Sequence, residues 1–529
     1  MKGLMSTAAS RAWVAFAALG LVVVALVFGL ALLPRLGGGQ ELIDAAEPAM
    51  TDPAVEGEVA AANALSAYVD LAHPLMTRRG KAADEVSELV AIISRRTRVS
   101  PRRARAFVRS EAPHTEALLR ALPLSAVADE RVAFARFLSQ TLNVTPDELQ
   151  DELARSFPRL FQTLAQLSGV TSGWYDVPGI EAMTSFGGED VRTMRAVRNY
   201  VRDDLVGTLA QERDRFQYAA GWGGIGSIPQ LLLIIGIVTI AFGLLQARRA
   251  AADPPGRLAW RFAAAIGVLI VLLVVALQYF PRLDGADKLV SELGPAFEEQ
   301  RVSGLRAGTD LIVQTVRFGD PIATPEGGAA DEYPRLLAFV SERSGLSRRQ
   351  VRGRLQDAAP RTAALLEAIP LSAVADEVPG LFAALAGKLG IGEEELVPTL
   401  ERRTPALAQA LLAAGPATSN WNRIPGTEGL ERFDGTAPVR SLPAFAAYLD
   451  GDLVPVIEGQ RGNFERLADT WPGVNVLAPL LLGLGLIVAI YSTAMMIRAT
   501  EPPGRGPSPM SREPRRASLR RRRPEAERR

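Results

Sequence analysis

The stretch Pro123-Leu-Ser-Ala-Val-Ala-Asp-Glu130 occurs a second time, unchanged, as Pro370-Leu-Ser-Ala-Val-Ala-Asp-Glu377. In a chain this rich in alanine, chance identity is on the order of one in ten per position. Eight consecutive identities then have a chance of about 10⁻⁸ per pairing, against roughly 10⁵ possible pairings. The repeated octapeptide therefore predicts a tandem duplication with an offset of 247 residues.

The same offset extends the match in both directions from the octapeptide. It relates Trp13 to Trp260, Pro34-Arg35-Leu36 to Pro281-Arg282-Leu283, Ala83-Asp84-Glu85 to Ala330-Asp331-Glu332, and Trp174 to Trp421. After one inserted residue the offset is 248, which relates Tyr200 to Tyr448, Asp204-Leu205-Val206 to Asp452-Leu453-Val454, and Phe216 to Phe464. We expect parallel repeats related by a pseudo-two-fold axis along a membrane normal.

Four stretches without any charged residue are long enough to cross a bilayer: 14–33, 228–246, 262–280 and 476–497. A transmembrane helix needs roughly 20 apolar residues. The first stretch could instead be a cleaved signal peptide. Its apolar run exceeds the roughly 7–15 residues of a signal core, and no small-x-small cleavage site precedes Leu32-Leu-Pro-Arg35. We therefore expect the stretch 14–33 to be retained as a membrane anchor.

Arginine gathers beside particular ends of these stretches, at Arg11, at Arg248, Arg249, Arg257 and Arg261, and at Arg498. The positive-inside rule then predicts a multi-pass cell-membrane protein with both termini cytoplasmic. The expected order is a cytoplasmic N-terminus (1–11), span (12–33), extracytoplasmic domain (34–227), span (228–246), cytoplasmic loop (247–259), span (260–280), second extracytoplasmic domain (281–475), span (476–497) and a disordered basic cytoplasmic tail (498–529).

The two long segments outside the spans are rich in alanine, leucine, arginine and glutamate, a composition typical of helices. Helices are predicted at 55–77, 84–96, 101–111, 126–142, 146–167 and 191–218, with counterparts in the second copy. The fold class expected is an all-α integral membrane protein with four transmembrane helices and two homologous helical extracytoplasmic domains. The absence of cysteine excludes disulfides and thiol chemistry.

A repeated loop carries the strongest candidate site. It reads Trp174-Tyr-Asp-Val-Pro178-Gly179-Ile-Glu181 in one copy and Trp421-Asn-Arg-Ile-Pro425-Gly426-Thr-Glu428 in the other. One reading is a structural corner, because Pro-Gly suits a type II turn. The anchors would be Trp174, Pro178, Gly179, Phe186, Trp421, Pro425, Gly426 and Phe433. The other reading is a partner-binding loop. Its exposed candidates are Tyr175, Asp176, Glu181, Asn422, Arg423, Thr427 and Glu428.

No catalytic, cofactor or metal motif stands out. Asp129 and Glu130 of the octapeptide could perform acid–base chemistry, but a structural role at a helix start is expected. His73 and His114 align with Asp320 and Arg361, so neither repeats as a zinc ligand. We therefore expect no enzyme activity, no cofactor and no metal.

The four apolar stretches contain no acidic, basic or histidine side chain, which argues against an ion- or proton-coupled transporter. Gly236, Gly243, Gly483 and Gly485 favour close helix packing. In the basic tail, Ser518 follows Arg515-Arg516-Ala, a kinase-like pattern, although binding to anionic lipid head groups is the favoured reading.

The function expected is that of a non-enzymatic bacterial cell-envelope membrane protein whose outer helical domains bind or scaffold a protein complex, polymer or lipid. The bacterial origin is inferred from an arginine- and alanine-rich composition with few lysines. Alternatives are a membrane ligand sensor or a pore or transporter subunit. No nucleic-acid partner is expected.

Overall fold

The computed structural model describes residues 8–221, 224–250, 257–468 and 473–498. Across these residues the fold is helical, and the only β-type pairings are two isolated bridges. The tail with Ser518 and parts of the expected N-terminus and middle loop lie outside the described residues. The expectation of an all-α fold is thus confirmed.

Within the described residues, four helices are long and apolar enough to cross a membrane: α1 (Ala8–Gly29), α12 (Ser227–Ala250), α13 (Arg257–Ala276) and α24 (Leu477–Arg498). They match the four predicted stretches, with shifted ends. The first and third end earlier than expected because Ala31 and Gln278 adopt left-handed backbone conformations (φ 48° and 52°), which close the helix. These four helices form the larger part of one compact unit, the span unit.

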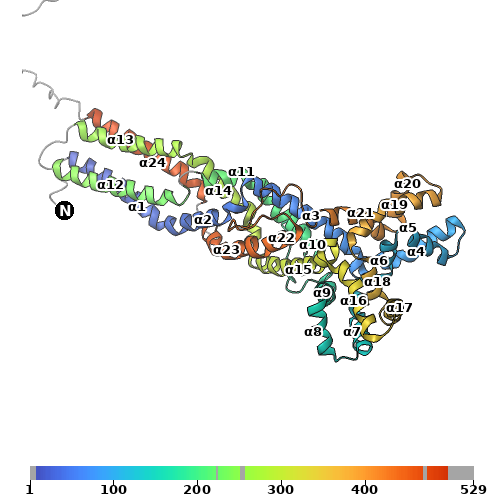
Figure 1. Cartoon of the computed structure of the whole chain (residues 1–529). Coiled ribbons are helices and arrows are strands. Elements are labelled where there is room, and N and C mark those ends of the chain that lie inside the picture. The colour runs from blue at the N-terminus through green and yellow to red at the C-terminus, as the bar shows by residue number, and fades with distance from the viewer. Residues whose placement is uncertain (1–7, 222–223, 251–256, 469–472, 499–529) are drawn as a thin grey trace, which may run out of the picture. The chain divides into compact units, whose positions relative to one another are not determined.

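Small residues bring these helices together in pairs, α1 beside α12 and α13 beside α24 (Figure 1). A Cβ atom at Gly20 would lie 2.7 Å from the carbonyl oxygen of Gly236, and one at Gly267 would lie 2.4 Å from the amide nitrogen of Ala489. Backbones that approach this closely tolerate only glycine. Of the predicted packing glycines, Gly236, Gly243 and Gly485 make such contacts, whereas Gly483 has no neighbour within 4 Å.

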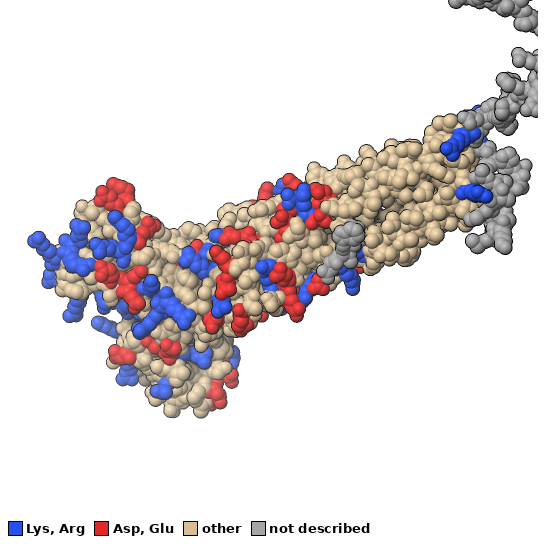
Figure 2. Space-filling view, turned by 180° about the vertical axis from the view of Figure 1, so that it is seen from behind, with Lys and Arg blue, Asp and Glu red and all other residues tan. Residues whose placement is uncertain are grey.

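Two equivalent tryptophans join the pairs. Trp13 stacks on Trp260 with ring centroids 3.8 Å apart, and both are buried in an apolar cluster with Phe16 and Val488. On the face shown in Figure 2, charged side chains cover the helical remainder of the chain but leave the apolar helices bare along most of their length. Arginines lie in the last turns of α12 and α24, including Arg249 and Arg498.

The segments 27–231 and 279–477 together form a second compact unit, called here the large unit. The residues of the two expected extracytoplasmic domains, 34–227 and 281–475, fall within this unit. Helices of the first segment are α2 (Leu32–Ala46), α3 (Asp52–Met76), α4 (Ala82–Thr97), α5 (Pro101–Glu111), α6 (Pro113–Ala121), α7 (Leu124–Leu142), α8 (Pro146–Ser156), α9 (Pro158–Gly173), α10 (Met194–Asn199), the π-helix η4 (Tyr200–Val206) and α11 (Gly207–Ala220).

The second segment repeats this order. Its helices are α14 (Tyr279–Leu293), α15 (Glu299–Ala323), α16 (Ala329–Ser344), α17 (Arg348–Ala358), α18 (Pro360–Ala368), α19 (Leu371–Leu389), α20 (Glu393–Arg403), α21 (Pro405–Ser419), α22 (Leu442–Tyr448), the π-helix η7 (Leu449–Leu453) and α23 (Val454–Ala468). Short 3₁₀ turns η2 (Glu47–Ala49) and η5 (Gly294–Phe297) also correspond.

The two segments interleave. Helix α3 packs on α21 of the other segment, and its counterpart α15 packs on α9. In the same reciprocal way α2 packs on α23 and α14 on α11, while the equivalent helices α6 and α18 pack on each other (Figure 1). The two segments therefore pack against each other through these helix pairs and form a single unit.

The repeated octapeptide serves this interleaving. Glu377 accepts hydrogen bonds from the amide nitrogens of His114 (3.0 Å) and Thr115 (2.8 Å) at the start of α6. Glu130 accepts hydrogen bonds from the amide nitrogens of Arg361 and Thr362 at the start of α18, both at 2.9 Å. Each carboxylate thus caps a helix of the other segment. The structural role is as expected, but the amide donors belong to the other segment rather than to the local helix.

The repeated Ala-Asp-Glu motif makes a second pair of such caps. Glu332 accepts from the amide nitrogens of Arg159 and Leu160 at the start of α9, and Glu85 accepts from that of Leu407 at the start of α21. The residues preceding α6, α9 and α18 are alanine or phenylalanine, which offer no side-chain cap. The crossing glutamates supply what the local sequence lacks.

Two predicted helix ranges were wrong. The helix expected at 146–167 is two helices, α8 and α9, because Phe157 leaves the helical conformation before Pro158 (φ −137°, ψ 55°). The helix expected at 191–218 begins only at Met194, where Thr193 caps it, and it contains the π-helix η4. Helix α6 was not predicted.

Candidate functional site

The tryptophans of the repeated loop are core residues. Trp174 and Trp421 are 0% and 1% exposed. The indole Nε1 of Trp421 donates to Asp320 Oδ1 (3.2 Å), and that of Trp174 donates to His73 Nδ1 (3.1 Å). The aligned pair His73 and Asp320 therefore performs one task in the two copies, which is to accept the indole proton.

His73 is consequently held neutral. Its Nδ1 accepts from Trp174, so the ring proton resides on Nε2, which lies 3.3 Å from the hydroxyl of Tyr175. Burial, followed by the nearby charge of Arg195, lowers the pKa of His73 to about 4. The expectation of an ordinary packing residue missed this paired contact, which only the fold brings together.

The turn residues have the expected geometry. Gly179 and Gly426 adopt positive φ angles of 89° and 88° after the exposed prolines Pro178 and Pro425. Phe186 packs edge-on against Tyr200, and Phe433 packs in the same way against Tyr448. Tyr200 begins the π-helix η4, and Tyr448 ends α22 directly before the π-helix η7.

The candidate partner-binding residues differ in their exposure to solvent. Asp176, Glu181, Arg423 and Glu428 are exposed. Tyr175 is half-buried, because its hydroxyl donates to the carbonyl oxygen of His73.

In the second copy, Asn422 is exposed but donates to Thr324 and Glu326. Thr427 was expected to be exposed, and this was wrong. It is 1% exposed, and its hydroxyl donates to the carbonyl oxygen of Ile424 (2.8 Å). The exposed residues do not converge on a shared pocket, although Tyr175 and Asp176 border an open cleft with Arg78, Arg79 and Asp129.

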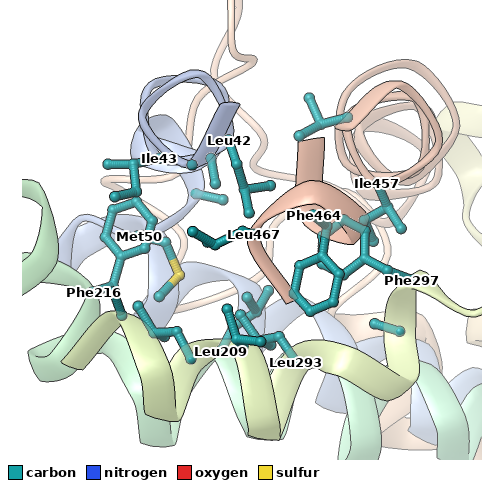
Figure 3. A pocket seen from close by; sticks show the side chains of 18 of the residues that line it. Leu42, Ile43, Met50, Leu209, Phe216, Leu293, Phe297, Ile457, Phe464 and Leu467 are labelled. Atoms are coloured by element: carbon teal, nitrogen blue, oxygen red, sulfur yellow. The ribbon is translucent and has the colours of Figure 1, made fainter. Parts of the chain in front are cut away.

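A cavity in the large unit is lined entirely by Gly, Ala, Val, Leu, Ile, Met and Phe (Figure 3). Its walls come from α2, α11, α14 and α23, together with η5 and the ends of the π-helices. The side chains labelled in Figure 3 are Leu42, Ile43, Met50, Leu209, Phe216, Leu293, Phe297, Ile457, Phe464 and Leu467. Phe433 of the repeated loop also lines it.

The two repeats contribute the same positions to this cavity. Leu42 and Leu289, Leu205 and Leu453, and Phe216 and Phe464 are identical residues at equivalent positions, and all line it. Both segments of the large unit therefore line the cavity. Phe464 stacks on Phe297 with ring centroids 4.3 Å apart, which closes one part of the wall.

The cavity has a volume of about 80 Å³, inside a wider space that opens to solvent. It is thus smaller than the roughly 300–1,000 Å³ typical of ligand pockets and has room for a small apolar group. An apolar cavity does not retain ordered water, because water needs polar partners there. The site can therefore accept an apolar group, and its lining offers no side chain for acid–base or nucleophilic chemistry.

In the described ranges, no group of three or more His, Cys, Asp or Glu side chains could hold a metal ion. Glu58 is fully buried, and Tyr448 donates a hydrogen bond to it. Burial raises the pKa of Glu58 to about 8, so it is largely protonated at neutral pH.

Sequence reasoning missed the cavity because its lining residues look like ordinary core positions. The one available signal was the repeat itself, which retains Leu, Leu and Phe at the three positions named above. Comparison of the chain with protein-family models, with curated proteins and with solved structures finds no match.

Proposed function

We propose that this chain is a non-enzymatic, multi-pass membrane protein of the bacterial cell envelope whose large unit holds an apolar ligand between its two repeats. The observation that carries the proposal is the cavity lined only by apolar side chains and glycine. Burying such a surface against an apolar ligand gains about 25 cal/mol per Å². A lined cavity favours ligand binding over docking of a protein on a flat surface.

The proposed topology places the large unit outside the cytoplasm and both termini inside. It is supported by arginines at the ends of α12 and α24 and by the charges that cover the large unit. The repeated helix order, the reciprocal packing and the crossing glutamates support an origin by tandem duplication. The exposed residues Asp176 and Arg423 remain candidates for contact with an envelope partner.

A cavity-filling substitution tests the proposal. Ala46 lines the cavity from α2, whereas its neighbour Ala45 does not. We expect Ala46→Phe to weaken binding of a fluorescent fatty acid to the full-length chain in amphipol by at least about tenfold. Ala45→Phe, the matched control on the same helix, should bind as the unmodified chain does. Equal binding by all three proteins would exclude the cavity as the site.

A further inference from the structure

Three helices of the first segment form an apolar groove that is open at the surface of the large unit. Helices α7, α8 and α9 pack on one another (Figure 1), and the groove that they line has a volume of about 530 Å³. Leu336 of α16 and Leu366 of α18, both buried, also line it. The groove shares no lining residue with the apolar cavity described above, so it is a separate site.

An apolar stripe with the period of a helix runs along one wall of the groove. From Phe157 into α9 the lining residues follow the spacing i, i+3, i+4, i+7 and i+8: Phe157, Leu160, Phe161, Leu164 and Ala165. Such a stripe normally packs against another helix. Phe161 and Leu164 are only half-buried, Ala165 is exposed, and Val132 on the opposite wall is 63% exposed. The described residues therefore leave part of the groove uncovered.

The charged side chains that line the groove are both positive. They are Arg131 and Arg136 of α7. Both are exposed, and within the described residues neither side chain forms an ion pair. Helix α8 lines the groove with Leu149 and Leu153, whereas its acidic residues do not line it: Asp147, Glu148, Asp151 and Glu152. The groove thus combines an apolar surface with two unpaired positive charges.

The second repeat retains the leucines of this groove but not its arginines. At the offset of 247, four lining leucines recur as Leu396, Leu400, Leu407 and Leu411. Arg131 and Arg136 are replaced by Val378 and Ala383, and the two lining phenylalanines of the stripe by Thr404 and Ala408. Helices α19, α20 and α21 nevertheless form in the same order. This helix arrangement therefore does not require the arginines, which favours a role for them in contact with a partner.

We propose that the groove binds an amphipathic helix of a partner protein, with the apolar face of that helix on the stripe and its acidic side chains beside Arg131 and Arg136. A helix presents apolar residues at the spacing of the stripe, so the ridges of one fit the grooves of the other. Two unpaired arginines attract an acidic helix and disfavour a basic one. The inference goes beyond the proposed function, because it assigns a second site to a different kind of ligand.

The test selects binders from a displayed library of amphipathic helices of about 18 residues, or five turns. Each helix has one leucine stripe, and the positions flanking the stripe vary among glutamate, glutamine and lysine. The target is the full-length chain in phosphatidylcholine nanodiscs, and empty nanodiscs remove helices that bind lipid. We expect glutamate to exceed lysine at the flanking positions by about tenfold among the selected helices. Selection without a charge preference, or of no helix at all, would overturn the inference.

Charge reversal locates the preference. Arg131→Glu combined with Arg136→Glu should select lysine instead of glutamate, and both positions are exposed, so the fold tolerates the change. Arg102→Glu combined with Arg105→Glu is the matched control, because it makes the same change of charge at exposed positions of α5 that do not line the groove. A glutamate preference that survives reversal at α7, or is lost in the control, would overturn the assignment.

A filling substitution tests the groove itself. Ala165 is exposed and lines the groove, whereas Ala154 of α8 is exposed and does not. We expect Ala165→Trp to lower the affinity for the selected acidic helices by at least about tenfold and Ala154→Trp to leave it unchanged. Equal binding by the two variants would place the selected helices elsewhere and overturn the inference.

Discussion

Replacing Glu377 by alanine removes one of the contacts that tie the repeats together. Its carboxylate accepts three hydrogen bonds at the start of α6, from the amides of His114 and Thr115 and from the hydroxyl of Thr115. Loss of a helix cap costs about 0.5–2 kcal/mol. The hydroxyl of Thr115 is fully buried and loses its acceptor, which costs about 1–3 kcal/mol more. We expect Glu377→Ala to lower the free energy of unfolding by roughly 2–4 kcal/mol.

The assay is chemical unfolding of the full-length chain followed by tryptophan fluorescence, since Trp174 and Trp421 are buried in the large unit. Asp376→Ala is the control on the neighbouring, exposed residue and should change stability by less than about 0.5 kcal/mol. Glu130→Ala should cost as much as Glu377→Ala, because Glu130 makes the corresponding bonds to α18. If Glu377→Ala and Asp376→Ala unfold alike, the crossing cap does not stabilise the unit and the reasoning fails.

Three further outcomes are expected. Trp421→Ala should destabilise the large unit by about 3–5 kcal/mol in the same unfolding assay, because it removes a buried aromatic side chain; a loss below 1 kcal/mol would contradict the anchor role. The pKa of Glu58 in the folded protein, about 8, lies above its ordinary value. The stability that protonated Glu58 contributes to the folded protein is therefore complete below about pH 4.5 and is lost as pH rises through 8. Glu58→Gln should therefore flatten the fall in stability between these pH values, and an unchanged pH profile would refute the assignment. Ser185→Cys and Thr436→Cys should react with an impermeant thiol reagent in intact cells, whereas Ser508→Cys should not; the opposite pattern would reverse the topology.

The sequence predicted the helical class and the four apolar helices because both depend on local composition. It could not predict how the copies pack. The octapeptide match shows that Glu130 and Glu377 are equivalent, but it is equally compatible with a cap inside each copy and a cap across copies. Only the fold shows that each glutamate reaches the other segment.

The candidate loop was predicted in part. Buried tryptophans and positive-φ glycines follow from residue type, since large aromatics and Pro-Gly turns have strong preferences. The burial of Thr427 does not follow from its residue type, because a threonine beside glycine is compatible with a buried or an exposed position. The cavity could not be predicted for a related reason. An apolar residue such as Leu42 predicts burial, but it does not predict whether the space beside its side chain is filled.

Covalent capture of a lipid probe would show directly whether the cavity of the large unit holds an apolar ligand. A photoactivatable fatty acid would be cross-linked to the full-length chain in its native membrane and the adducts mapped by mass spectrometry. We expect adducts on peptides that contain Leu42 to Met50 and Leu289 to Phe297, which line the cavity from both segments. We also expect Ala46→Phe to remove these adducts while those on the spans persist. Adducts confined to α1, α12, α13 and α24 would contradict a ligand site in the large unit.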